Sequence, residues 1–271
     1  IILLKRVLEK GLSLQLNSAP LKAMGFRSIN SVQIATIHKG EWKENGKEEC
    51  DLLLVSGGWS PTLHLLSHKG IKPVWNDNNL CFLSGPHNEP ITLVGSAAGI
   101  WDHEKCFESG TSGGVKASVL LGKIKVNYSF PDPLKIINSI EPLYEIKSSK
   151  SKTKSFVDFQ HDVTTKDIRL AHQEGFISVE HLKRYTTLGM ANDQGKMGNI
   201  IGIALMAEAL GKKISEVGTT TFRPPYTPIA IGALAGRNTG KHFRPLRKSP
   251  LHDWNISKGA VMIEAGLWQR P

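Results

Sequence analysis

Two short apolar segments, each followed by a glycine-rich turn, constrain the fold of this chain more than any other feature. Residues 49–55 end in four apolar side chains and precede a turn at 57–61, and residues 91–94 precede a turn at 95–99. Continuous apolar runs of this length are typical of strands buried on both faces. With a small-residue helix expected around 113–121, this order of elements indicates an α/β dinucleotide-binding layer.

The two turns are the candidate cofactor site. Glycine lets a backbone approach a ligand closely, and small residues at a helix start leave N–H groups free to bind a phosphate or ribityl group. The candidate cofactor-binding residues are Gly57, Gly58, Pro61, Gly95, Ser96, Ala97 and Gly99. Ordinary strand-to-loop geometry and tight packing remain alternative explanations of these turns.

The rest of the chain divides by composition into further parts. We expect residues 1–124 to form one domain, in which a strand at 32–37 is followed by a turn at Asn45-Gly46. Prolines and a run of four lysines between Lys147 and Lys154 indicate a hydrated linker at 125–155.

Residues 156–216 are predicted to form a small helical domain. Thr164 with Asp167 is typical of a helix start, Ser178 of a second, and residues 198–210 predict a third, with their apolar positions in the core. From 217 to 271 prolines and glycines favour loops, with a strand expected at 259–263.

A third constellation combines cations and hydroxyls at 184–196 with a proline-locked turn at 219–226. Such groups suit an anion or a subunit interface, and a purely structural role explains them equally well. The candidates for anion binding or interface contact are Arg184, Thr186, Thr187, Lys196 and Arg223.

Other classes of function find little support in the sequence. Cys50, Cys81 and Cys106 lack C-x-x-C spacing and are expected to be reduced, mostly buried thiols. The histidines, including His64 and His68, are interpreted as solvated or core residues, so no metal site is expected. No nucleophile–base pair can be proposed from spacing, and no catalytic residue is assigned.

Most of the net charge of +10 lies in residues 217–271, which contain eight Lys or Arg residues and only two acidic residues. Clustered cations can bind nucleic-acid phosphates, but no nucleic-acid motif accompanies them, so we expect a solvated face or a contact with an anionic cofactor or partner. No apolar run reaches the roughly 20 residues that cross a bilayer, and no secretory signal is present. We expect a cytoplasmic protein that binds neither nucleic acid nor membrane.

Long literal motifs resemble the alpha subunits of heterotetrameric sarcosine oxidases, over essentially the whole chain. They are Asp51–Pro61, Phe156–Gln160, Asp162–Thr164, Lys166–Ile168, His181–Thr187, Gly189-Met190, Asp193–Lys196 and Gly218–Pro228. The tail is similar to the opening of the folate-binding domain of glycine-cleavage aminomethyltransferases, through Ser249–Asp253, Gly259–Met262 and Gly266–Trp268. Lacking an initiator Met, the chain is expected to be an internal fragment.

The resemblance implies an α/β fold class made of three pieces. These are the C-terminal part of a dinucleotide-binding, flavin-reductase-like domain, a small helical domain, and the start of an α+β folate-binding domain. It also implies oxidation of sarcosine to glycine, with transfer of the one-carbon unit to tetrahydrofolate and formation of hydrogen peroxide.

The same resemblance implies cofactors and partners. NAD would lie on this subunit, lined by the two glycine turns, with tetrahydrofolate mostly downstream. FAD and FMN would lie in or at a beta subunit, and small gamma and delta subunits would complete the complex. Flavin reductases show Gly-Asp where this chain has Gly95-Ser96, which favours NAD over FAD. Relatives of the helical domain can bind an iron–sulfur cluster through cysteines, and residues 156–216 contain none.

Three alternatives stay open. The chain could serve a related secondary-amine dehydrogenase, acting on N-methylglutamate or proline, because substrate identity would be set mainly in the partner subunit. It could instead be a non-catalytic scaffold for the flavin subunit. A free-standing flavin disulfide reductase is disfavoured by the missing redox cysteine pair.

Overall fold

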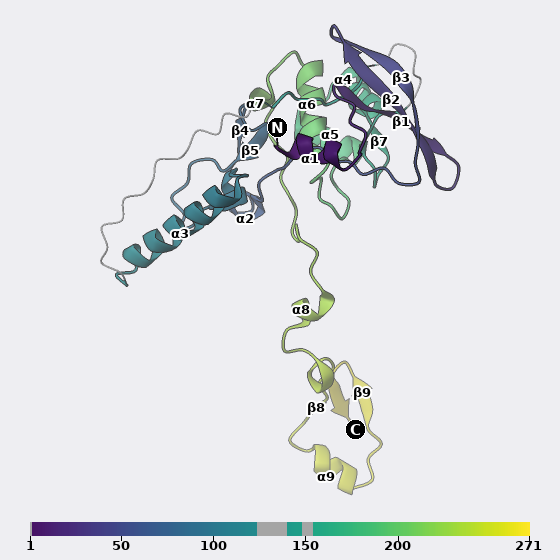
Figure 1. The fold of residues 1–271 in the computed structure, drawn as a ribbon. Helices are drawn as coiled ribbons and strands as arrows, with labels where there is room; N and C mark the ends of the chain where they lie inside the picture. The colour runs from purple at the N-terminus through teal and green to yellow at the C-terminus, as the bar shows by residue number, and fades with distance from the viewer. Residues whose placement is uncertain (1, 124–139, 148–153) are drawn as a thin grey trace. The chain divides into compact units, whose positions relative to one another are not determined.

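The computed structural model describes residues 2–123, 140–147 and 154–271. The chain divides into two compact units, Ile1–Arg223 and Pro224–Pro271, and each is described by itself (Figure 1). Most of the predicted linker at 125–155 lies outside the described residues. No helix in the described ranges is long and apolar enough to cross a membrane.

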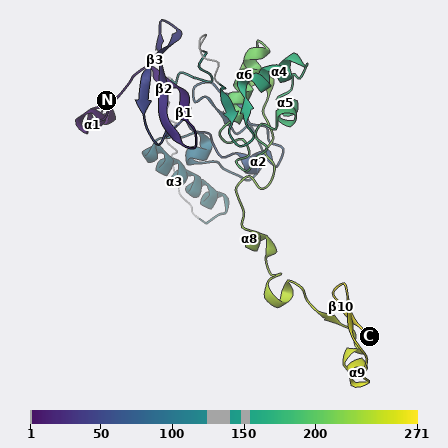
Figure 2. The same ribbon diagram turned by 90° about the vertical axis from the view of Figure 1, so that its right-hand side faces the viewer.

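An antiparallel meander dominates the first part of the chain. Helix α1 (Ile2–Glu9) is followed by strands β1 (Ser18–Gly25), β2 (Ile29–His38) and β3 (Glu41–Glu49), paired in the order β1-β2-β3 (Figure 2). The predicted strand at 32–37 is confirmed as part of β2, and its residues Val32 and Ala35 are buried. The β-branched residues of this strand suit a pleated, half-buried surface.

The turn between β2 and β3 is not where the sequence predicted it. Lys39 and Gly40 form the turn, both with positive φ, of 50° and 82°. Asn45-Gly46 lies inside β3 instead, beside a register shift between Gln33 and Ala35 of β2. Positive φ at two successive residues is what a tight hairpin turn requires. Gly46, with φ of 95°, accommodates the irregularity within the strand.

The two apolar segments expected as buried strands are not strands in this structure. Residues 51–55 and 91–94 are irregular. The side chains of Leu52, Leu54 and Val55 are 66%, 84% and 74% exposed. An isolated segment becomes a strand only when a neighbour pairs with its backbone, and no described segment pairs with these two. The parallel layer predicted from them is therefore not formed by the described residues.

Short elements connect the meander to the helical part. Helix α2 (His64–Ser67) is followed by the hairpin of β4 (Val74–Asn76) and β5 (Cys81–Leu83), then by the 3₁₀ turn η1 (Gly95–Ala98) and by α3 (His103–Leu120). The helix predicted at 113–121 is the second half of α3. The described strands of residues 1–124 thus pair only antiparallel, and the chain as a whole mixes α and β structure.

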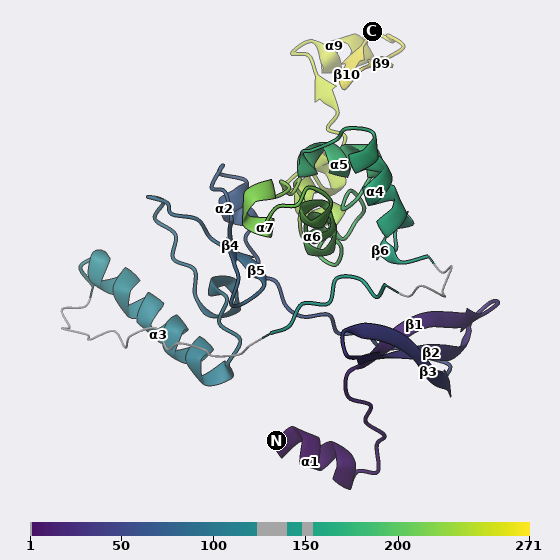
Figure 3. The ribbon, with the colours of Figure 1, turned by 90° about the horizontal axis from the view of Figure 1, so that it is seen from above.

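The predicted helices after residue 156 are present. Strands β6 (Phe156–Asp158) and β7 (Val163–Thr164) pair antiparallel, and α4 (Thr165–Gln173), α5 (Val179–Thr186), α6 (Asn199–Ala209) and α7 (Ile214–Val217) follow (Figure 3). The cap predicted at Thr164 is confirmed. The Asp167 carboxylate accepts hydrogen bonds of 2.7 Å from both the N–H and the hydroxyl of Thr164.

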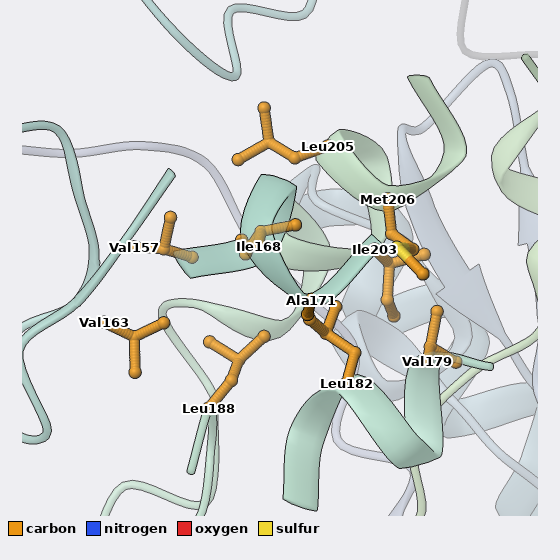
Figure 4. Packing of buried hydrophobic residues seen from close by; sticks show 10 residues of the cluster. All are labelled: Val157, Val163, Ile168, Ala171, Val179, Leu182, Leu188, Ile203, Leu205 and Met206. Carbon is orange, nitrogen blue, oxygen red and sulfur yellow. The ribbon is translucent and has the colours of Figure 1, made fainter. Parts of the chain in front are cut away.

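These elements enclose the main hydrophobic core. Figure 4 shows its ten side chains, which are Val157, Val163, Ile168, Ala171, Val179, Leu182, Leu188, Ile203, Leu205 and Met206. Phe82 of β5 packs against this cluster, and α7 contacts β4, so the β4–β5 hairpin adjoins the helical part. The sequence predicted these apolar positions as core because they recur at helical spacing.

A strained loop between α5 and α6 is held by two buried polar side chains, which together fix where α6 begins. Asp158 accepts hydrogen bonds from the N–H groups of Gln160, His161 and Gly189, at 2.8, 3.1 and 2.9 Å. Asn199 at the start of α6 fills the space beside Gly189 and Gly195, which have φ of 67° and 75°.

The second unit holds a small sheet in the order β8-β10-β9. It contains α8 (Ile231–Ala235), η2 (Gly240–His242), β8 (Arg247–Lys248), α9 (His252–Ser257), β9 (Ile263–Ala265) and β10 (Trp268–Arg270). The strand predicted at 259–263 begins only at Ile263, so the prediction was placed too early. Within residues 224–271, all of which are described, His252 alone is buried.

Replacing Gly189 with alanine should destabilise the helical part more than replacing Gly175. Both glycines have positive φ, so each variant carries a backbone cost of about 1–2 kcal/mol. Only at Gly189 would the new Cβ also meet a buried atom, Oδ1 of Asn199 at 2.3 Å, while at Gly175 nothing lies within 4 Å. The extra overpacking should add about 1–3 kcal/mol. Native-state hydrogen exchange of the α6 amides measures the difference, and equal costs would contradict the packing described.

The Thr164–Asp167 cap should make stability depend on pH. Hydrogen bonds from the hydroxyl and N–H of Thr164 hold the pKa of Asp167 below its ordinary value of 3.8. A carboxylate with a depressed folded pKa stabilises the fold above the unfolded pKa, and this stability is lost as the pH falls through the folded pKa.

Asp167→Asn should therefore lower the free energy of unfolding by about 1 kcal/mol at pH 7, and this gap should close as the pH falls below 3.8. Urea unfolding at several pH values measures it. Asp162→Asn removes the charge of an exposed carboxylate in the same segment and should change little. A gap that persists at low pH would contradict the assignment.

Candidate functional site

The two predicted glycine turns meet through a pair of tryptophans. Trp59 follows Gly57-Gly58, and Trp101 follows the 95–99 turn. The two indole rings lie 6.3 Å apart between centroids, tilted by 33°. Two segments about forty residues apart in sequence are thereby brought together. Aromatic pairs at this separation attract each other beyond the area they bury.

The first turn is open around its glycines. An added Cβ at Gly57 or Gly58 would meet no atom within 4 Å, and Gly58 has φ of 116°. Trp59 is 74% exposed, whereas Pro61 is buried and leads into α2. Among the residues that the structure describes, nothing within 4 Å requires the absence of a side chain at Gly57. This is the arrangement expected where backbone approaches a ligand from outside.

The second turn is determined partly by packing. The N–H of Gly95 donates to the Ser109 hydroxyl at 3.2 Å, and the Asn79 amide donates to the carbonyl oxygen of Gly99 at 3.3 Å. A Cβ at Gly99 would lie 2.6 Å from a methyl carbon of Leu83. Gly99 is therefore required by its neighbours within the chain, whatever else it contacts.

The helix start expected at this turn lies several residues later. Residues 95–98 form their own 3₁₀ turn, and α3 begins at His103. Its first turn is capped by the carboxylate of Asp102, which accepts from the N–H of Lys105 at 3.1 Å, and it carries Glu104. The prediction that residues 95–99 open this helix was wrong, and two acids at the start of α3 disfavour a phosphate there.

A second constellation gathers around the backbone of residues 221–223. Glu180 of α5 accepts from the N–H of Thr221, and the Lys183 ammonium donates to the Thr221 carbonyl oxygen at 2.6 Å. His68 Nε2 lies 3.0 Å from the carbonyl oxygen of Phe222, which can only accept, so this ring nitrogen carries the proton. Three side chains from two segments of the chain thus bind one short stretch of backbone.

The fourth contact of this stretch comes from the loop before α6. The side-chain oxygen of Gln194 accepts from the N–H of Arg223 at 3.3 Å. We call this arrangement the backbone clamp; its side chains are His68, Glu180, Lys183 and Gln194. Glu180 and Lys183, one helical turn apart on α5, bind the N–H and the carbonyl oxygen of Thr221. The clamp therefore holds the backbone of residues 221–223 as a neighbouring strand would.

Some of the predicted anion-binding residues lie at the backbone clamp, and the others lie elsewhere in the chain. Arg223 and Arg184 both act electrostatically on the buried ammonium of Lys183. Lys196 acts on His64, on the α2 side. Thr186 and Thr187 donate their hydroxyl protons to carbonyl oxygens of Leu182 and Thr186. The two threonine hydroxyls are thus hydrogen-bonded to the backbone at the end of α5.

Burial explains the electrostatics of the clamp. Burial lowers the pKa of Lys183, and although Glu180 opposes this, Arg223 and Arg184 add to the lowering. Burial also lowers the pKa of His64, with contributions from His68 and Lys196. A lowered pKa means that both groups give up their protons more readily than the free side chains do.

Sequence reasoning missed most of the clamp. Lys183 lies next to Leu182 on the face of α5 that enters the core, and a lysine at a core position is a detectable signal. His64 at the start of α2 and His68 at its C-cap are four residues apart, and their rings lie 5.9 Å from each other, a helical spacing that the sequence itself displays. Glu180 and Gln194 gave no signal, because their partners are backbone groups distant in sequence.

The thiols and candidate metal ligands complete the survey. Cys81 is buried, and burial raises its pKa to about 11, so it stays a thiol. Cys50 and Cys106 are partly buried, and all three are free. Within the described ranges, no group of three or more His, Cys, Asp or Glu side chains could hold a metal ion.

Removing one clamp side chain should loosen residues 219–223. In Glu180→Ala the N–H of Thr221 loses its acceptor, so amides of this stretch should exchange with deuterium about tenfold faster, since a hydrogen bond to a charged group contributes about 1.5–3 kcal/mol. Hydrogen-exchange mass spectrometry measures this. Gln173→Ala, an exposed change on α4, is the matched control. Unchanged exchange in Glu180→Ala would show that the clamp does not hold the segment.

Comparisons with known proteins cover most of the chain. Residues 152–237 match the family described as the sarcosine oxidase A3 domain. The chain is 44% identical over 254 residues to a sarcosine oxidase subunit alpha of Rhizobium meliloti (strain 1021), covering 91% of this chain and 24% of that protein. It is 36% identical over 252 residues to a sarcosine oxidase subunit alpha of Corynebacterium sp. (strain P-1), covering 89% and 26%.

A solved structure adds the fold. The crystal structure of L-proline dehydrogenase from P. horikoshii matches with a TM-score of 0.59 and 18% identity, covering 86% of this chain and 47% of that one. At that identity the likeness concerns the fold alone. The chain spans about a quarter of the length of the curated relatives it matches. Over about nine-tenths of its length the chain is similar to part of a sarcosine oxidase alpha subunit, the family that its motifs resemble.

Proposed function

We propose that the full-length protein is the alpha subunit of a sarcosine-oxidising complex, an oxidoreductase that acts on a CH–NH bond. In this proposal the complex converts sarcosine to glycine, transfers the one-carbon unit to tetrahydrofolate and forms hydrogen peroxide. The 44% identity to a protein of that name, over nine-tenths of this chain, supports the assignment. The segment in hand would contribute cofactor contact and subunit contact, and we assign no catalytic residue to it.

The dinucleotide site is proposed at the two glycine turns. Its residues would be Gly57, Gly58, Pro61, Gly95, Ser96, Ala97 and Gly99. The observation that carries it is the approach of the turns through Trp59 and Trp101, with open space around Gly57 and Gly58. Flat aromatic rings and side-chain-free backbone suit a ligand with planar rings.

Residues 1–124 would then be the C-terminal part of a dinucleotide-binding domain whose remainder lies elsewhere in the full-length subunit. The exposed apolar run at 52–55 supports this, because four consecutive apolar side chains are expected to be covered in the complete domain. Its backbone, unpaired among the described residues, would join the sheet of that domain as a strand.

NAD is the proposed ligand of this site. An FAD-type second turn would offer an acid to the ribityl chain, whereas Gly95 is followed here by Ser96. FAD and FMN would belong to a beta subunit, tetrahydrofolate would bind mostly downstream of residue 271, and gamma and delta subunits would complete the complex. We expect the complex in the cytoplasm.

Two alternative functions stay open, because the sequence of this chain does not identify the amine that the complex oxidises. A related dehydrogenase could act on proline, and the solved structure that shares the fold is named a proline dehydrogenase. A scaffold would hold the flavin subunit without any ligand of its own. Both are outcomes of the experiment below.

The deciding experiment uses the complete complex, purified after co-expression of all subunits. Hydrogen peroxide formation and reduction of an artificial electron acceptor are measured with sarcosine, proline and N-methylglutamate, and released dinucleotide is identified by mass after denaturation. Peroxide from sarcosine together with released NAD is the expected result. Turnover of another amine alone would reassign the substrate, and absence of any dinucleotide would favour the scaffold.

A single methyl group tests the dinucleotide site. Because an alanine Cβ at Gly57 would meet nothing within 4 Å of this chain, Gly57→Ala should leave the thermal midpoint of the NAD-free subunit unchanged. If the ligand backbone approaches there, the variant should lose about tenfold or more in NAD affinity through overpacking. Gly232→Ala, also in open space, without a positive φ and distant in sequence from both turns, controls for a glycine change. Wild-type affinity in Gly57→Ala would remove Gly57 from the site.

A further inference from the structure

The second glycine turn is attached to the β4–β5 hairpin by two contacts at Gly99. The carbonyl oxygen of Gly99 accepts a hydrogen bond from Nδ2 of Asn79 at 3.3 Å. Since a carbonyl oxygen can only accept, the amide nitrogen of Asn79 is the atom that faces it. Leu83 packs directly against Gly99, so that a Cβ there would lie 2.6 Å from a methyl carbon of this leucine. Gly99 is thus held by one residue that precedes β5 and one at its end.

The hairpin is in turn anchored to the helical core. Phe82 of β5 packs against the main hydrophobic cluster, and its ring meets that of the buried Trp75 edge to face, at 5.1 Å between centroids. The indole N–H of Trp75 donates to the carboxylate of Asp77 at 2.9 Å. Successive side chains of a strand point to opposite faces. Strand β5 therefore presents Phe82 to the helical core and Leu83 to the second glycine turn.

The side chain of Asn79 is not needed to close the hairpin turn. An asparagine at a turn commonly bonds nearby backbone, and Asn76 does so here, because its side-chain oxygen accepts from the N–H of Asn79 at 2.9 Å. The next residue, Leu80, has φ of 47°. The backbone around Asn79 is therefore held by its own turn, and the amide of Asn79 remains available to bind Gly99.

We propose that Asn79 is a positioning residue of the dinucleotide site, an inference that rests on the site proposed above. The turn at 95–99 is attached at its start to α3, through the bond from the N–H of Gly95 to Ser109, and at its end to the hairpin, through Asn79. A binding loop that is already ordered does not lose conformational freedom when its ligand arrives. By holding the Gly99 carbonyl, Asn79 keeps the turn in the shape that NAD meets.

The test measures NAD binding to the NAD-free full-length subunit by isothermal titration calorimetry. Asn79→Leu keeps the shape of the side chain and the backbone N–H that Asn76 holds, but it removes the donor to Gly99. It should weaken NAD binding about fivefold, the effect of one lost hydrogen bond. Amides of residues 95–100 should exchange with deuterium faster by a similar factor before NAD is added. Asn79→Ala, which adds no apolar bulk, should show the same two effects.

Two further variants separate positioning from general damage to the hairpin. Asn78→Leu makes the same change at the exposed neighbouring residue and should bind NAD as the wild type does. Asn79→Gln restores an amide donor on a longer side chain and should recover part of the affinity. Wild-type affinity in both Asn79→Leu and Asn79→Ala, or equal weakening by Asn78→Leu, would overturn the role of Asn79 and leave the dinucleotide site standing. A wild-type subunit that binds no NAD would overturn the site itself, and this inference with it.

Discussion

The buried carboxylate of Asp158 is the interaction on which the helical part depends. It joins the β6–β7 turn to Gly189, more than thirty residues later, through three N–H groups. A carboxylate that accepts several backbone N–H groups satisfies donors which the strained loop could not bond internally. With Asn199 filling the space beside Gly189 and Gly195, it determines where α6 begins. The helix then carries Ile203, Leu205 and Met206 into the core.

Local signals predicted the helical part well. The Thr164–Asp167 pair and the apolar spacing of residues 198–210 act within one or two helical turns, so the sequence alone reveals them. The strands expected at 49–55 and 91–94 failed for a physical reason: apolar character indicates burial, but pairing partners distant in sequence decide whether a strand forms. The Lys39-Gly40 turn was missed because Asn45-Gly46 is the stronger local signal, and the bulge beside it depends on β2.

The two candidate sites differ in how visible they were. The glycine turns stand out in sequence because a glycine usually marks a place where a side chain would not fit. The structure distinguishes Gly99, where a Cβ would collide with Leu83, from Gly57, where a Cβ would meet no described atom within 4 Å. Arg184 and Arg223 stood out through charge. Glu180 and Gln194 could not be found in this way, because they bind main-chain groups whose location only the folded chain provides. The residues that say most about function are those, such as Gly57, whose identity is not explained by packing against neighbouring residues of the chain.

The backbone clamp has a consequence for how this segment can vary. Within residues 221–223, the side chains of His68, Glu180, Lys183 and Gln194 bind only peptide groups. The clamp therefore places no demand on the Thr221 side chain. Proline is barred from 221 and 223, where an N–H is used, and becomes acceptable from 224 onward, where two prolines occur in succession. Any substitution at 221 or 223 that keeps the backbone N–H leaves the hydrogen bonds of the clamp in place.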